Sequence, residues 1–156
     1  EKVLEFNKEN YDYFIAIGDN NIRKSIFLRL NKLNFNFVNI LHSKSFIDKD
    51  SEMGIGNFFG QFSNMGTCTK IGNFNIINSY GNIEHEVNIG DFNHIAPSST
   101  VCGRTSLNDG IFIGANAVII EKLSIADNTT IGAGSVVLKS VKIKNQKLLG
   151  VPAKII

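Results

Sequence analysis

The sequence predicts a mainly β protein, most of it a left-handed parallel β-helix, because aliphatic residues recur at every sixth position. Stepping by six from Ile71 to Val137 meets twelve aliphatic residues in succession, although only 43% of the chain is hydrophobic. The same phase continues backwards to Ile47. A period of six fits neither an α-helix nor simple strand alternation. It fits a coil of three short strands, so that one full coil takes about eighteen residues and is stable only when stacked on its neighbours.

Small residues recur at two further positions of each hexad. The first position directly follows the aliphatic residue and holds Gly54, Gly60, Gly66, Gly72, Gly90, Ala96, Gly114, Ala126 and Gly132. The second lies four residues after it and holds Ser63, Thr69, Ser99, Thr105, Ala117, Thr129 and Ser135. We expect the aliphatic residues to point inward and the glycines to let the chain turn each corner.

The start of the chain breaks this pattern and predicts two parts: a short βαβ-like module over residues 1–42 and the β-helix, with a C-terminal tail, over residues 43–156. Residues 11–17 read as a strand ending in Gly18, and residues 35–41 read as a second strand. Between them, Asn20 can cap a helix in which Ile22, Ile26, Phe27 and Leu30 share a face. The module is too short for a complete nucleotide-binding domain. The polar stretch 139–147 is expected to be a loop.

Composition narrows the classes of partner. A net charge of +2 without a basic stripe makes nucleic acid an unexpected partner. The apolar runs span only a few residues, which predicts no membrane insertion. The two cysteines, Cys68 and Cys102, form no disulfide framework, so we expect a cytoplasmic protein. Because the first residue is Glu1 rather than Met, we expect the sequence to begin inside a longer chain or after a removed tag.

Several motifs resemble a known family. The hexads and the closing Gly-Val-Pro-Ala-Lys at 150–154 are similar to those of the hexapeptide-repeat acyltransferases. Residues 83–94 hold a Glu-His-Glu followed by a second histidine, and they resemble bacterial UDP-4-amino-sugar N-acetyltransferases of the PglD/NeuD-like group. Residues 14–18, 21–24 and 123–127 resemble the same group. The likeness covers nearly the whole chain.

The resemblance implies an N-acetyltransferase that uses acetyl-coenzyme A (acetyl-CoA). The acceptor would be the 4-amino group of a UDP-linked amino-deoxy sugar, in surface-glycan or glycoprotein biosynthesis. His85 would be the general base and Glu86 would raise its basicity, with Glu84 open as an alternative partner. No metal is implied, and four residues would contact acetyl-CoA: His94, Gly103, Ala115 and Ala133.

The resemblance also concerns the acceptor. Residues 1–42 would be part of a nucleotide-sugar-binding module, with Gly18 as a contact of the nucleotide sugar. In the family, a glycine-rich loop after the first strand helps to hold this ligand, and this sequence has no such loop. Either the sequence lacks a preceding segment, or the protein has lost part of the nucleotide pocket.

Counting in eighteens adds a geometric expectation. Gly103 follows His85 by eighteen residues and should lie directly above it, where its backbone N–H can face the thioester oxygen as charge develops. Ala115 and Ala133 are also one coil apart. His94 is half a coil from His85, so the two histidines do not easily share a pocket in one subunit. We therefore predict a homotrimer with active sites between subunits.

Three other functions stay open at this point. One is an O- or N-acyltransferase with a different nucleotide-sugar acceptor. Another is a zinc carbonic anhydrase on the same fold, although His42 precedes the coils and the histidine spacing does not match. The last is a truncated, inactive scaffold. His42 reads as structural, and Cys102 is better explained by packing than by chemistry.

Overall fold

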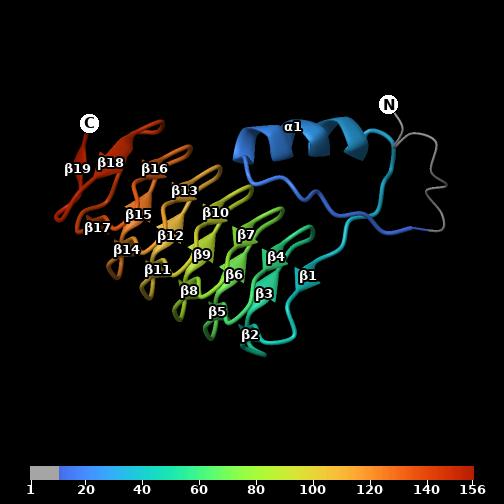
Figure 1. Cartoon of the computed structure of the whole chain (residues 1–156), viewed down its shortest axis with the longest axis horizontal. Helices are drawn as coiled ribbons and strands as arrows, with labels where there is room; N and C mark the ends of the chain where they lie inside the picture. The colour runs from blue at the N-terminus through green and yellow to red at the C-terminus, as the bar shows by residue number, and fades with distance from the viewer. Residues whose placement is uncertain (1–10) are drawn as a thin grey trace.

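The computed structural model describes residues 11–156, and its main body is the predicted parallel β-helix (Figure 1). One face is an eight-stranded sheet made of β1 (Ile40–Leu41), β4 (Phe58–Phe59), β7 (Ile76–Ile77), β10 (His94–Ile95), β13 (Phe112–Ile113), β16 (Thr130–Ile131), β18 (Lys147–Leu149) and β19 (Lys154–Ile155). The second is a six-stranded sheet made of β2 (Phe46–Ile47), β5 (Asn64–Met65), β8 (Asn82–Ile83), β11 (Thr100–Val101), β14 (Val118–Ile119) and β17 (Val136–Val137). The third is a five-stranded sheet made of β3 (Glu52–Met53), β6 (Lys70–Ile71), β9 (Asn88–Ile89), β12 (Ser106–Leu107) and β15 (Ser124–Ile125).

The aliphatic repeat forms the core as predicted. Strands one coil apart pair in parallel with a register of eighteen residues, so that Ile95 lies between Ile77 and Ile113. These three side chains are fully buried, at 0% exposure. The first residue of each two-residue strand points outward, and the second stacks on its equivalents in the neighbouring coils. A single column of apolar side chains on each face therefore holds the coils together.

The glycines that follow the aliphatic residues do not turn the corners, contrary to the expectation. The corner residues with positive φ are mostly not glycine; Glu86 has φ 57° and Arg104 has φ 60°. The glycines lie at strand ends, where the next coil leaves no space for a side chain. A Cβ at Gly66 would be 2.9 Å from the backbone nitrogen of His85. These glycines are therefore required by the close approach of successive coils.

The N-terminal module contains α1 (Asn20–Asn31), which lies along one side of the β-helix (Figure 1). The helix is capped by Asp19 and not by Asn20, because the Asp19 carboxylate accepts a hydrogen bond from the backbone of Ile22. Ile22 is 52% exposed, so it does not share the buried face that was expected of it. Instead Phe27 packs on Phe74 and Phe92, two stacked rings at a corner of the β-helix.

A buried arginine fixes the module to the β-helix. Arg23 is 1% exposed, and its guanidinium donates hydrogen bonds to the carbonyl groups of Phe74 and Asn93, at 2.8 and 3.1 Å. Further bonds go to the carbonyl of Ile17, at 2.8 Å, and to that of Gly18, at 3.1 Å. Burial lowers the pKa of Arg23 to about 10. One side chain thus joins the segment before α1 to two coils of the β-helix.

The strands expected on either side of α1 are much shorter than predicted. Tyr13 forms a single parallel bridge with Phe37. After it, the N–H of Ile17 bonds to the carbonyl of Ile15, at 2.9 Å, which turns the chain towards α1. The second expected strand is split in two. Phe37 bridges Tyr13, whereas residues 40–41 form β1, the first strand of the eight-stranded sheet, and pair with β4. The C-terminal segment adds β18 and β19, and Val141 bridges Ile125. Within residues 11–156, no helix is long and apolar enough to cross a bilayer.

Candidate active site

The corner between β8 and β9 carries His85 and Glu86, in the turn that joins the six-stranded sheet to the five-stranded sheet. The positive φ of Glu86 projects its carboxylate beside the preceding imidazole. Nδ1 of His85 lies 2.9 Å from Oε2 of Glu86. Because a carboxylate only accepts, Nδ1 carries a proton, and in the neutral imidazole Nε2 then keeps its lone pair. This is the arrangement that a general base requires.

Gly103 lies directly above His85, as the eighteen-residue spacing predicts. A Cβ at Gly103 would be 2.6 Å from both Nε2 and Cε1 of His85, so the imidazole occupies the space that any larger residue would need. The backbone N–H of Gly103 makes no hydrogen bond within residues 11–156. Gly103 thus lies against the imidazole of His85 and has an unused backbone donor. We call His85, Glu86 and Gly103, together with Arg104, the His85 corner.

Of the two candidate partners of His85, Glu86 is the one in contact with it. Glu84 accepts a hydrogen bond from the amide of Asn82, at 2.7 Å, whereas Glu86 contacts the imidazole. The pKa of Glu86 is lowered, first by the hydrogen bond from His85 and next by that from Arg104. Burial, reinforced by Glu84 and Glu121, raises the pKa of the Cys102 thiol. A raised pKa makes the thiolate scarcer, which agrees with a packing role for Cys102.

His94 and Gly18, which the sequence assigned to two different ligands, are in direct contact. Nδ1 of His94 lies 3.1 Å from the carbonyl oxygen of Gly18 and donates to it. The ring packs edge-on against Phe112, and its Nε2 is buried without a hydrogen-bond partner in the described part of the chain. Burial lowers the pKa of His94, so the imidazole is neutral at neutral pH. Nε2 is thus an unused acceptor at the eight-stranded sheet.

Two cavities adjoin this contact. One, of about 420 Å³, is polar and is lined by Gly18, Asp19, Asn20, Asn21, His94, Gly110, Phe112, Asn128 and Thr130. The other, of about 250 Å³, is mainly apolar and is lined by Phe14, Ala16, Ile17, Gly18, Phe58, Ile76, Asn78 and His94. Both lie between the N-terminal segment and the eight-stranded sheet. His94 and Gly18 line both cavities, so a ligand in either one would meet them.

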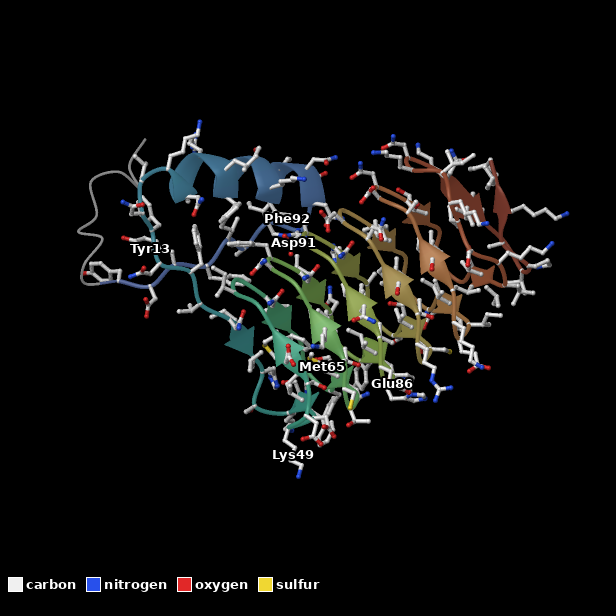
Figure 2. The ribbon with its side chains drawn as sticks, turned by 180° about the vertical axis from the view of Figure 1, so that it is seen from behind. Tyr13, Lys49, Met65, Glu86, Asp91 and Phe92 are labelled. Carbon is white, nitrogen blue, oxygen red and sulfur yellow. The ribbon has the colours of Figure 1, made fainter. Side chains whose placement is uncertain are left out.

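Ala115 and Ala133 lie one coil apart at the corners that join the eight-stranded sheet to the six-stranded sheet. Ala115 is half-buried and Ala133 is exposed, and the N–H of Gly134 bonds to the carbonyl of Ala115 at 2.8 Å. Neither alanine is near the His85 corner in the same chain. The His85 corner is the edge of the three-sided coil that lies opposite the eight-stranded sheet. In Figure 2, Phe92 lies under α1, whereas Glu86 lies far from this helix.

Residues 1–30 match the family described as the PglD N-terminal domain. GDP-perosamine N-acetyltransferase from Caulobacter crescentus, in a mutant form complexed with CoA and GDP-perosamine, is 29% identical, with a TM-score of 0.88. That match covers 92% of this chain and 68% of the other. The predicted resemblance is confirmed.

Two further solved structures share the fold. The acetyltransferase domain of PglB from Neisseria gonorrhoeae, in complex with acetyl-coenzyme A, has a TM-score of 0.94 at 22% identity and covers 99% of this chain and 75% of that one. WeeI from Acinetobacter baumannii has a TM-score of 0.81 at 23% identity, with coverages of 99% and 75%. The chain therefore has the same fold as these two proteins.

The sequence did not predict two sets of contacts near this site. Arg104 donates from Nε to Oε2 of Glu86, at 2.9 Å. Its position, eighteen residues after Glu86, is the one signal that could have indicated the contact. Asn20, which was expected only as a cap, donates to the carbonyl groups of Gly110 and Ile111, at 3.1 and 3.0 Å. Nothing in the local sequence indicates that second contact, because it joins residues about ninety positions apart.

Proposed function

We propose that this protein transfers an acetyl group from acetyl-CoA to the amino group of a nucleotide-linked amino-deoxy sugar. The likeness to sugar N-acetyltransferases supports the expected acyltransferase class and its CoA co-substrate. The observation that carries the proposal is the His85 corner, where a histidine with a free Nε2 and a carboxylate on Nδ1 lies against a glycine. The 4-amino group of a UDP-linked sugar is the acceptor that the sequence favours.

The corner suits direct transfer. An amine attacks a thioester only when it is neutral, and it must lose a proton as the new C–N bond forms and the C–S bond breaks. Nε2 of His85 accepts that proton, while Glu86 stabilises the resulting imidazolium through Nδ1. The N–H of Gly103 can donate to the thioester oxygen as negative charge develops. Base catalysis of this kind typically contributes about 10²–10⁴-fold to the rate.

We propose that CoA lies in a cleft between subunits. In one chain the His85 corner and the corners of Ala115 and Ala133 belong to different edges, so a second copy must supply one side of the cleft. The six-stranded sheet suits the interface because its outward residues carry no charge: Phe46, Asn64, Asn82, Thr100, Val118 and Val136. The five-stranded sheet, by contrast, presents Glu52 and Lys70. A closed trimer built on the six-stranded sheet places three such clefts between subunits.

The acceptor is proposed to bind in the two cavities beside Gly18 and His94. The polar cavity offers Asn20, Asn128 and Thr130 to the hydroxyl and phosphate groups of a nucleotide sugar. The apolar cavity presents Phe14 and Phe58, which suit a planar base. His94 lines both cavities, and its buried Nε2 is an unpaired acceptor in this region. These observations support a contact of His94 with the acceptor at least as well as one with acetyl-CoA.

The test is a thiol-release assay with acetyl-CoA and matched UDP- and GDP-linked amino sugars. A 4-amino sugar should give CoA release that depends on both substrates, and His85→Ala should lower turnover by about 10²–10⁴-fold without changing the melting temperature. Undiminished turnover in that variant would remove His85 from the mechanism. Acceptance of the matching hydroxy sugar would favour O-acylation. An active monomer in light scattering would contradict the shared cleft.

A further inference from the structure

Arg104 shares one carboxylate oxygen with the proposed base. Oε2 of Glu86 lies 2.9 Å from Nδ1 of His85 and 2.9 Å from Nε of Arg104. Arg104 occupies the corner position of Glu86 one coil further along, with nearly the same positive φ. Its own backbone N–H donates to the carbonyl of His85, at 3.0 Å. We propose that Arg104 is a positioning residue for His85 that acts through Glu86, an inference that rests on the proposed function.

The geometry gives Arg104 a role that Glu86 cannot fill alone. The side chains of His85, Glu86 and Arg104 are each about half exposed, at 47%, 48% and 52%. A carboxylate that is half exposed and held by one bond rotates readily into water. A second, charged donor on the same oxygen keeps it in the rotamer that meets Nδ1. The imidazole then keeps the tautomer in which Nε2, next to Gly103, is the acceptor.

Arg104 also moderates the charge at this corner. Glu86 contacts His85, whereas Glu84 and Glu121 act on Cys102, and Lys122 pairs with Glu121 at 3.5 Å. Arg104 is the cation bonded directly to the carboxylate that His85 uses. Without it, the uncompensated charge of Glu86 would stabilise the imidazolium more strongly. The base would then stay protonated, and therefore inactive, up to a higher pH.

These two effects predict different results for two substitutions. Arg104→Gln removes both the charge and the Nε donor. We expect turnover to fall about 3- to 10-fold, somewhat less than for a buried orienting partner. The acid limb of the pH–rate profile should move up by about 0.2–0.7 pH units, the size of an exposed ion-pair interaction. Arg104→Lys keeps the charge but not the planar donor, so it should restore the pH profile more fully than the turnover.

The experiment measures kcat, KM for acetyl-CoA, KM for the acceptor and the pH profile for both variants, in the wild-type and Glu86→Gln backgrounds. Lys122→Gln, which removes a neighbouring cation paired only with Glu121 in the described residues, is the matched control and should behave as wild type. If Arg104 acts through Glu86, Arg104→Gln should lower kcat only while Glu86 is present. Both KM values should stay unchanged.

Other outcomes would overturn the inference. A raised KM in both backgrounds would mean that Arg104 binds a ligand itself. Wild-type kinetics for Arg104→Gln would reduce the contact to an ordinary surface pair. Either result leaves the proposed function intact so long as His85→Ala remains inactive. Absence of CoA release by the wild-type protein with every acceptor would instead refute the proposed function.

Discussion

Replacing Gly103 by alanine should reduce activity far more than stability. The new Cβ would lie 2.6 Å from Nε2 and Cε1 of His85, whereas carbon atoms in contact are about 3.5–4.0 Å apart. The imidazole must therefore retreat by about 1 Å, which separates it from Glu86. A displacement of 1 Å at a reacting group can cost about 10²-fold in rate. The half-exposed imidazole has room to move, so the fold itself should tolerate the change.

Gly66 provides the matched control, because a Cβ at Gly66 would meet the backbone of His85 rather than its side chain. It would lie 2.9 Å from the nitrogen of His85 and from the carbonyl carbon of Glu84, and neither can move without shifting a coil. Gly66→Ala should therefore lower the free energy of unfolding by about 1–3 kcal/mol. Gly103 has no positive φ, so Gly103→Ala should melt within a few degrees of wild type.

Differential scanning fluorimetry and thiol release would be measured on both variants. Full turnover in Gly103→Ala would show that the close contact between Gly103 and His85 has no part in catalysis. A large loss of stability in that variant would show that the imidazole cannot retreat as described. In a His85→Ala background, Gly103→Ala should have little further effect, because the residue with which it clashes is gone.

Three other substitutions test the fold and the acceptor side. Ile113→Ala, in the fully buried column, should lower the free energy of unfolding by about 2–5 kcal/mol in chemical denaturation, and a loss below 1 kcal/mol would contradict the packing. Arg23→Met should speed hydrogen exchange in α1 while the β-helix stays protected; unchanged exchange would refute its docking role. Because the folded-state pKa of His94 is lowered, stability should fall as pH drops through about 6.5, and His94→Asn should lessen that loss in melts at pH 7.5 and 5.5.

The sequence was sufficient to predict the β-helix, because the six-residue repeat of aliphatic residues can be counted directly. Each coil buries one aliphatic side chain per face, so Ile95 and Ile113 must align once the period is counted. The same count placed Gly103 on His85. The N-terminal module was harder to predict from the sequence, because its short strands depend on tertiary contacts. Asp and Asn cap equally well, so the sequence does not distinguish Asp19 from Asn20 as the cap, and it does not show that Arg23 is buried while Ile22 is exposed.

At the His85 corner, the contact that the sequence did not show joins two side chains on successive coils. A repeat brings residues eighteen apart into register, but it does not say which of them bond. Glu86 and Arg104 bond because both side chains project from corner positions with positive φ. The residues between them give no indication of this contact. At the same edge, Gly103 lacks a side chain, and the imidazole of His85 fills the space that this leaves. In this fold, then, a site can form where equivalent positions of successive coils hold different residue types. At the His85 corner one coil presents histidine, and the next presents glycine.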